Sequence, residues 1–252
     1  KSSNNDPLQE RKVIKQFLNN TIQGLLVWPC DTNENVAFFQ TISKKIPIVF
    51  VDRIFPEAQI PGVVMDCVGA GRDIVLHLGR QGWNRVLILV DPLKISTYQE
   101  VYQSMRETTA NISANHRFDF VDFQMNEFFD RYFSDPCGAV EDYTLRLENI
   151  LKTDNYDAIF CPYDEFLDRC YASTKLASLY PYKEIISMSN MRPTPRTVDF
   201  YRLGVREWIC DFEMMIRKAT EILHSIVFLK SRIYRQVRVK YFDVIRTSDR
   251  VL

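Results

Sequence analysis

The sequence lacks the long apolar runs and the motifs that indicate a membrane protein or a common enzyme class. No run approaches the roughly 18 apolar residues that a membrane-spanning helix needs, and no signal peptide is recognisable. The GxSxG, GxxxxGK(S/T), HExxH and CxxC motifs are all missing. Histidine is scarce, and His77, His116 and His224 lie far apart, which disfavours a histidine metal centre. We therefore predict a protein that is not an enzyme and that holds no metal or cofactor.

A net charge is missing as well, because 32 basic residues balance 32 acidic ones. Bulk charge therefore indicates no DNA-binding surface, and any contact with nucleic acid would have to come from elsewhere. Six cysteines are scattered without a paired motif, as buried free thiols are. We expect a reduced, cytoplasmic setting rather than a disulfide framework. The six are Cys30, Cys67, Cys137, Cys161, Cys170 and Cys210.

Apolar residues make up 46% of the chain and gather in short runs bounded by turn residues. The runs 46–51, 62–65 and 86–90 are typical of buried parallel strands. Between the last two, residues 69–82 have helical spacing, and Gly82 stands where a glycine ends a helix. This order predicts an α/β protein with parallel sheets. Further strands are expected at 24–29, 118–122, 158–161, 184–188, 206–210 and 237–245, further helices at 31–45, 97–109, 139–151, 165–179 and 212–229, and a loop from 191 to the strand at 206.

The segment 46–90 resembles the effector-binding domain of LacI/GalR transcription regulators and periplasmic sugar-binding proteins. The matching sequence is IPIVFVDR, then VVMD, then HLGRQGWNRVLIL, and Trp83 stands where the family has His. The positions that keep the family's residues are Pro47, Asp52, Arg53, Asp66, His77, Leu78 and Gly82.

The resemblance implies two similar lobes, each a parallel sheet flanked by helices, joined by a hinge that the chain crosses three times. The N-terminal lobe would hold residues 1–83 and 212–234, and the C-terminal lobe 84–211 and 235–252. The first strand, helix and strand of the family's first lobe are expected to be missing here.

Open α/β sheets bind ligands at the carboxyl ends of their strands, so polar residues there are the candidates for a binding site. Four of the candidates named below also have a structural interpretation. Asp52 and Asp164 could cap a turn or helix, Arg53 could form a surface ion pair, and Trp28 is more typical of the core. Tyr163 replaces the family's Asn and adds a stacking face. The predicted ligand-binding residues are Trp28, Asp52, Arg53, Gln124, Tyr163, Asp164, Ser189, Asn190 and Asp211.

Two departures from the family concern charged groups. The Arg that relatives carry in the helix after the third strand is replaced within residues 99–105, and the Asp of the family's Gly-Phe/Tyr-Asp run becomes Ser189 followed by Asn190. Each lost charged hydrogen bond is worth about 1.5 to 3 kcal/mol. We therefore expect an effector that differs from the best-known sugars.

The resemblance implies the ligand-sensing domain of a bacterial transcription regulator. It would bind a small sugar or sugar derivative in the cleft between the lobes and act as a homodimer. DNA would be bound only by an upstream module, a helix-turn-helix or a winged helix of the GntR kind found in arabinose repressors. An extracytoplasmic sugar-binding protein or a sensor input domain is the alternative, which the unpaired cysteines disfavour. An enzyme on the same scaffold is a third, without a nucleophile or metal motif.

Overall fold

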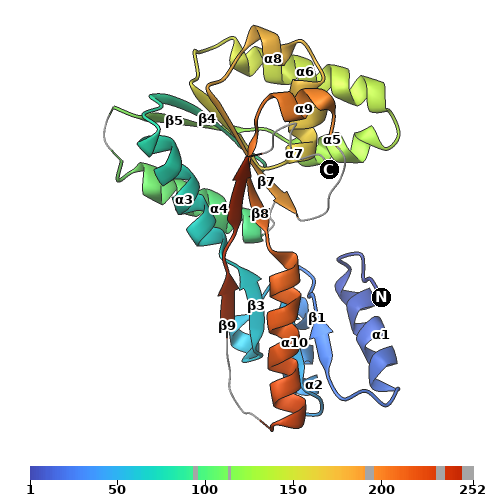
Figure 1. Cartoon of the computed structure of the whole chain (residues 1–252). Coiled ribbons are helices and arrows are strands. Elements are labelled where there is room, and N and C mark those ends of the chain that lie inside the picture. Colours follow the sequence, from blue (N-terminus) through green and yellow to red (C-terminus); the bar gives the residue numbers. More distant parts are fainter. Residues whose placement is uncertain (93–95, 113–114, 191–195, 231–235, 246–252) are drawn as a thin grey trace. The chain divides into compact units, whose positions relative to one another are not determined.

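The computed structural model describes residues 1–92, 96–112, 115–190, 196–230 and 236–245 (Figure 1). The strands are β1 (Leu25–Val27), β2 (Ile48–Val51), β3 (Gly62–Met65), β4 (Arg85–Val90), β5 (Arg117–Asp122), β6 (Ala158–Cys161), β7 (Glu184–Asn190), β8 (Arg206–Cys210), β9 (Gln236–Val239) and β10 (Phe242–Ile245). The helices are α1 (Pro7–Leu18), α2 (Val36–Ile42), α3 (Cys67–Arg80), α4 (Ser96–Thr109), α5 (Met125–Tyr132), α6 (Pro136–Leu151), α7 (Asp164–Phe166), α8 (Leu176–Leu179), α9 (Val198–Arg202) and α10 (Phe212–Phe228). Two 3-10 turns and a π-helical turn accompany them: η1 (Asn33–Asn35), η2 (Pro56–Ala58) and η3 (Leu167–Ala172). Among the helices of the described residues, none has both the length and the hydropathy that crossing a membrane requires.

The chain divides into two compact units, each with a sheet of its own. The first unit consists of Lys1–Asp66, Ile95–Thr97 and Asp211–Lys240, and the second of Cys67–Lys94, Tyr98–Cys210 and Tyr241–Leu252. Both sheets are built from parallel strands and both are flanked by helices, which confirms the predicted fold class.

The first unit is built on a four-stranded parallel sheet of order β1-β2-β3-β9. Its strand β2 is buried throughout, because helices cover both faces. On one face Phe50 packs with Ile14 of α1 and Phe39 of α2. Successive strand residues point to opposite faces, so Val49 is directed to the other side, where α10 packs along β1, β2 and β3 (Figure 1).

The second unit has a six-stranded sheet of order β10-β8-β7-β6-β4-β5, parallel except for β10, which runs antiparallel to β8. On one face Leu87 and Ile159 pack with residues of α5, α6 and η3. Toward the other face lie α3 and α4 (Figure 1). These two helices approach closely, because a Cβ on Gly71 would lie 2.4 Å from the carbonyl oxygen of Val101.

Several elements lie where the sequence pattern predicts them. Strands β6 and β8 span the predicted residues, and α10 begins at the predicted Phe212. Gly82 has φ 75°, and its N–H donates to the carbonyl of Gly79 at 3.2 Å. Because that left-handed conformation favours glycine, Gly82 ends α3 as predicted. Helix α3 itself begins at Cys67, slightly earlier than expected.

Three expected elements are wrong in detail. The helix predicted at 165–179 is divided into α7, η3 and α8. The strand predicted at 237–245 is two strands, since β9 pairs with β3 and β10 pairs with β8. The predicted loop after residue 190 contains α9, because the Thr197 hydroxyl accepts the N–H of Phe200 and starts a helix. Residues 191–195 of that loop lie outside the described residues.

The boundaries of the two units along the chain differ from those that the resemblance implies. Helix α3, expected in the N-terminal lobe, belongs to the second unit, where the Ser104 hydroxyl of α4 donates to the carbonyl of Val68 at 2.6 Å. Strand β9, expected in the C-terminal lobe, belongs to the first unit, where the N–H of Asp66 donates to the carbonyl of Val239 at 2.7 Å. Apart from the short segment 95–97, the chain therefore passes between units after residues 66, 210 and 240.

Candidate functional site

The carboxyl ends of β1, β2 and β3 form one edge of the first sheet, called here the first edge. Because the strands are parallel, the residues that follow them gather there. Arg53 is the centre of this group: its Nε lies 3.9 Å from Asp31 Oδ2 and 3.8 Å from Asp52 Oδ2. Its Nη1 donates to the carbonyl of Pro29 at 3.1 Å. Asp31, from the loop after β1, thus lies near the neighbouring residues Asp52 and Arg53, whose contact with a ligand stays a prediction.

Asp52 is held in an uncommon state at the first edge. Its φ is 70°, in the left-handed region, which few residues other than Gly, Asn and Asp adopt. Burial raises the pKa of its carboxyl, and Asp31 adds to the rise, whereas Arg53 and a hydrogen bond from the Trp28 side chain oppose it. The carboxyl therefore faces Trp28 and Arg53 rather than capping a helix. Strain and burial of this kind are common at binding sites.

Trp28 is half-exposed at 50%, so the expectation that it belongs to the core is wrong. Strand β1 ends at Val27, directly before Trp28, and the Trp28 ring packs against Phe212, with centroids 5.4 Å apart and planes inclined by 33°. Phe212 is itself 37% exposed. The Trp28–Phe212 pair is an aromatic platform at the first edge. Sequence reasoning missed Phe212, although its place at the start of α10 next to the candidate Asp211 was a usable signal.

The loop after β1 is fixed by two residues that sequence reasoning did not single out. Glu10 of α1 is only 4% exposed; one of its carboxylate oxygens accepts the N–H of Cys30 at 2.7 Å, and the other accepts from the Asn35 amide at 2.6 Å. Asn5 accepts the N–H of Asp31 at 3.0 Å and a donor of Arg53 at 3.4 Å. Glu10 lies four residues before the apolar Ile14, on the buried face of α1, which was the available signal.

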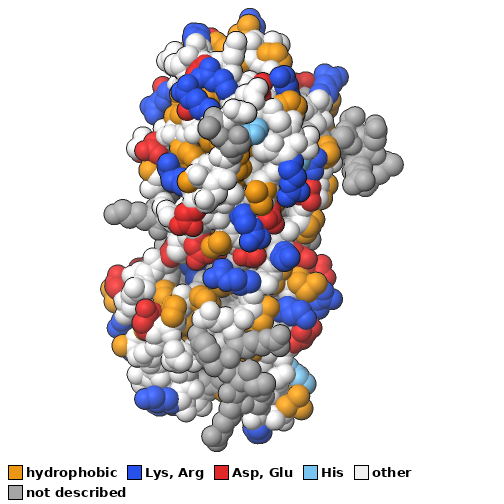
Figure 2. Space-filling view, turned by 90° about the vertical axis from the view of Figure 1, so that its left-hand side faces the viewer, with side chains coloured by type: hydrophobic (Ala, Val, Ile, Leu, Met, Phe, Trp, Pro, Cys, Tyr) orange, Lys and Arg blue, Asp and Glu red, His pale blue; other side chains and the backbone are white. Residues whose placement is uncertain are grey.

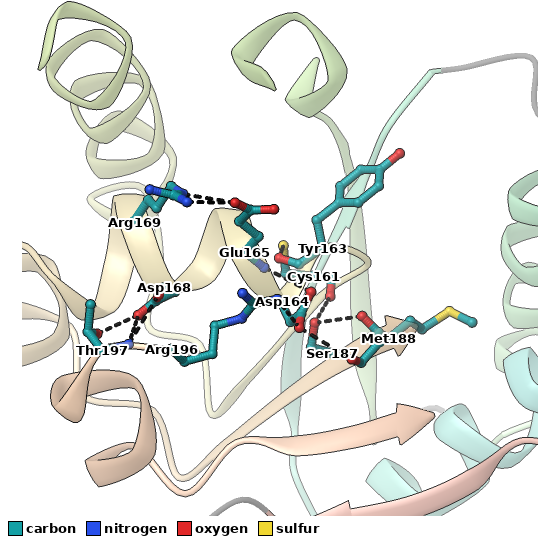
Figure 3. Close-up of polar contacts among 11 residues, drawn as sticks. Cys161, Tyr163, Asp164, Glu165, Asp168, Arg169, Ser187, Met188, Arg196 and Thr197 are labelled. Atoms are coloured by element: carbon teal, nitrogen blue, oxygen red, sulfur yellow. Dashed lines mark hydrogen bonds and ion pairs between the residues drawn. The ribbon is translucent and has the colours of Figure 1, made fainter. Parts of the chain in front are cut away.

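The carboxyl ends of β4 to β8 form the second edge, in the second unit. Here Asp164 meets Arg196 (Figure 3), and the Ser189 hydroxyl also contacts Asp164. Arg196 Nη2 lies 2.5 Å from Asp164 Oδ2, which also accepts from the Ser189 hydroxyl at 3.3 Å. The other oxygen of Asp164 accepts the N–H of Glu165 at 2.9 Å. Asp164 therefore accepts a backbone N–H in the first turn of α7 and also forms an ion pair, and its contact with a ligand stays a prediction.

Arg196 was missed by sequence reasoning, and its placement depends on η3. Asp168 in this π-helical turn is buried and accepts both the N–H and the hydroxyl of Thr197 (Figure 3). Because Thr197 follows Arg196 directly, this contact holds the guanidinium beside Asp164. The side chain of Arg196 is only 9% exposed, and its Nε is buried without a hydrogen-bond partner. π-helical turns are frequent at functional sites.

The remaining candidates are placed less directly. Tyr163 packs against aromatic rings in tilted and edge-on contacts, with centroids 5.3 Å from Tyr98 and 5.5 Å from Phe129, and burial raises the pKa of its phenol. Gln124 is exposed and precedes α5 without capping it. Asp211 caps α10 by accepting the N–H of Met214 at 2.9 Å. Asn190 is the last residue of β7, and its side chain lies outside the described residues.

Buried carboxylates and cysteines in the described residues do not assemble into a metal site. No group of three or more His, Cys, Asp or Glu side chains able to hold an ion occurs within the described part of the chain. Asp91, buried after β4, accepts the N–H of Asn126 at 2.8 Å instead. The arrangement at both edges is therefore suited to hydrogen bonding and stacking.

No protein-family model and no curated protein matches the sequence, but solved structures match the fold. A Cra transcriptional dual regulator from Pseudomonas putida, in complex with fructose 1-phosphate, is 17% identical over 98% of this chain and 86% of its own, with a TM-score of 0.69. A solute-binding protein of an ABC transporter from Burkholderia graminis, in complex with D-arabinose, is 11% identical over 97% and 82%, with a TM-score of 0.74. The chain has the type I periplasmic-binding-protein fold.

A third match of this fold is GanP, a glucose-galactose binding protein from Geobacillus stearothermophilus, 15% identical over 98% of this chain and 84% of its own, with a TM-score of 0.70. The matches thus include both regulators and solute-binding proteins. The expected resemblance is confirmed for the type I periplasmic-binding-protein fold, and at these identities the likeness concerns the fold alone.

Proposed function

We propose that this chain is the ligand-sensing domain of a bacterial transcription regulator and that its ligand is a small sugar or sugar derivative. The observation that carries the proposal is the first edge, where the carboxylate of Asp52, the guanidinium of Arg53 and the Trp28–Phe212 platform come together. An ionised carboxylate accepts sugar hydroxyls, and a guanidinium donates to them. An exposed aromatic face covers the C–H face of a sugar ring, so these groups suit a polyhydroxylated ring.

The second edge supports the proposal with the same kinds of groups. Asp164 and Ser189 supply polar atoms at the ends of β6 and β7. The Tyr163 ring packs with Tyr98 and Phe129. We assign sugar contacts to each edge separately. Gln124, Asn190 and Asp211 remain proposed contacts, and the capping role of Asp211 makes it the weakest of the three.

The thiols support a regulator rather than an extracytoplasmic protein. All six cysteines are free, and only Cys137 is exposed. Burial raises the pKa of the Cys161 and Cys170 thiols, so they stay protonated and unreactive. A chain with this many free thiols suits a reducing compartment, and we propose a cytoplasmic setting.

In this proposal a separate module binds DNA and this domain forms a homodimer. Lys and Arg side chains are interspersed with Asp and Glu on the face drawn in Figure 2, which is not the basic field of a DNA-binding surface. Ligand binding would shift the regulator between a DNA-bound and a released state, and it can do so only by its differential affinity for the two.

A second candidate function is an extracytoplasmic sugar-binding protein or sensor input domain, which the likeness to solute-binding proteins favours. Thiol labelling separates the two. A cytoplasmic regulator should give six free thiols when labelled in denaturant directly after purification from its native cell. Disulfide-linked cysteines in that sample would favour the second candidate.

A thermal-shift screen with neutral pentoses and hexoses tests the sugar assignment. A sugar at 100 times its dissociation constant should add about 2.7 kcal/mol to the free energy of unfolding. Asp52→Asn should then weaken the binding of the best sugar by about 10- to 100-fold, because a charged hydrogen bond contributes about 1.5 to 3 kcal/mol. Asp142→Asn makes the same change on α6, away from both edges, and should leave the affinity unchanged. The assignment is contradicted if no sugar moves the midpoint, or if both variants bind alike.

A further inference from the structure

Arg53, the partly buried cation of the first edge, is already paired with carboxylates of the chain. Arg53, 18% exposed, lies between the carboxylates of Asp31 and Asp52, and it also donates to the carbonyl of Pro29. Asp31 is held in turn, since its two oxygens accept the N–H and the hydroxyl of Ser96, each at 3.0 Å. The Arg53 Nε is buried and makes no hydrogen bond among the described residues, so Arg53 is paired with the two carboxylates by charge and not by a direct hydrogen bond.

Arg196, the cation of the second edge, is also paired with a carboxylate of the chain. Arg196 pairs with Asp164, and the clamp of Asp168 on Thr197 keeps it there. Its unpartnered Nε is buried, so it offers no donor to a ligand that approaches from solvent. Buried Asp91 adds another carboxyl group after β4. Glu165 of α7 is balanced by Arg169, at 2.6 Å.

Among the described residues of each edge, the guanidinium of Arg53 or Arg196 is therefore paired with a carboxylate of the chain. Lys240 follows β9 at the end of the first sheet, but its side chain is exposed. Lys94 and Arg192 lie outside the described residues. A phosphate or carboxylate of a ligand would lie near carboxylates of the chain, and this repulsion between like charges costs free energy. Neutral hydroxyls can donate hydrogen bonds to the same carboxylates without displacing the arginine that is paired with them.

We propose that each edge, taken by itself, selects uncharged sugars and rejects their phosphate esters and sugar acids, because the guanidinium of Arg53 or Arg196 there is paired with a carboxylate of the chain. This inference rests on the proposed function and narrows its ligand class. Asp164 is the residue that sets the selectivity at the second edge: it holds Arg196 in a neutral pair. Asp31 and Asp52 do the same for Arg53.

Calorimetric titration with matched pairs of sugars tests the selectivity. The pairs are D-fructose with fructose 1-phosphate, D-arabinose with arabinose 5-phosphate, and D-galactose with galacturonate. In every pair that binds, the uncharged member should bind at least about tenfold more tightly, which corresponds to 1.4 kcal/mol. Tighter binding of a charged member would overturn the selectivity while leaving the proposed function standing. If no member of any pair binds, the proposed function falls and the selectivity falls with it.

Asp164→Asn tests the cause of the selectivity, since it frees the Arg196 guanidinium without a large change of shape. For the pair that binds best, the preference for the uncharged member should shrink about tenfold or invert. Asp142→Asn on α6 removes the same charge from the surface of the same unit and should leave the preference unchanged. Arg196→Gln is the second variant. It removes the guanidinium and leaves Asp164 charged, so it should lower the affinity for the charged member below that of the unchanged protein. Equal preferences in Asp164→Asn and Asp142→Asn would contradict the proposed pairing.

Discussion

Glu10 of α1 accepts the backbone N–H of Cys30 at 2.7 Å, which fastens the loop after β1 to a helix twenty residues earlier in the chain. The second carboxylate oxygen accepts from Asn35, and that amide also donates to the carbonyl of Pro7. A single buried carboxylate thus joins α1, the first edge and η1. The position of Trp28 and Asp31 depends on this contact, because both belong to the loop that it fixes.

Glu10→Ala should lower the free energy of unfolding by about 2 to 6 kcal/mol, because it leaves two buried donors unsatisfied at about 1 to 3 kcal/mol each. Urea denaturation measures the change. Glu57→Ala removes an exposed carboxylate from η2 in the same unit and should cost less than about 0.5 kcal/mol. Equal stability of the two variants would show that Glu10 does not fasten the loop.

Gly71 is predicted to be essential for the packing of α3 on α4. Alanine favours helices over glycine by about 1 kcal/mol, but its Cβ would lie 2.4 Å from the backbone carbonyl oxygen of Val101. Gly71→Ala should therefore lower the stability by about 1 to 3 kcal/mol. Gly79→Ala in the same helix is the control: its Cβ meets Ile112 at 3.4 Å, and it should raise the stability by up to about 1 kcal/mol. A stabilising Gly71→Ala would contradict the close approach.

Asp52 should make the stability depend on pH in a defined direction. Burial raises the pKa of its carboxyl in the folded state above the value in the unfolded chain. The group therefore stabilises the fold while it is protonated, at pH below its unfolded pKa, and this contribution is lost as the pH rises through the folded pKa. Ionised Asp52 is thus a cost at neutral pH, as a buried charge at a binding site often is.

Asp52→Asn should accordingly raise the free energy of unfolding at neutral pH, and the gain should shrink below about pH 4, where aspartate becomes protonated in the unfolded chain. Asn tolerates the positive φ of this position as well as Asp does, so the backbone is not strained further. Urea denaturation of both proteins at several pH values gives the comparison. If the variant is less stable at neutral pH, attraction to Arg53 outweighs burial and the account of Asp52 fails.

The sequence predicts the fold well where local pattern decides it. Strands β6 and β8 are predicted correctly from short apolar runs bounded by turns. The end of α3 is predicted from Gly82, because the residue after the helix adopts a left-handed backbone conformation that favours glycine. Asp52 and Arg53 were named as candidates because they end a predicted strand, and open α/β sheets bind ligands at the carboxyl ends of strands. Each of these inferences uses residues that are close in sequence.

The sequence fails where distant contacts decide the structure. The alternation of residues 237–245 cannot reveal that β9 and β10 pair in different sheets. The π-helical turn η3 keeps nearly helical spacing of apolar residues, so it is invisible in the pattern. Arg196 meets Asp164 across 32 residues, and Phe212 meets Trp28 across the chain, so neither partnership follows from local spacing.

The central claim is that Asp52 and the Trp28–Phe212 platform bind a sugar ring. A crystal structure of the chain with the neutral sugar that binds best in the titrations tests it most directly. The account predicts the ring against this platform, with a hydroxyl donating to the Asp52 carboxylate. A sugar bound away from the first edge, with Asp52 still facing only Trp28 and Arg53, would contradict it.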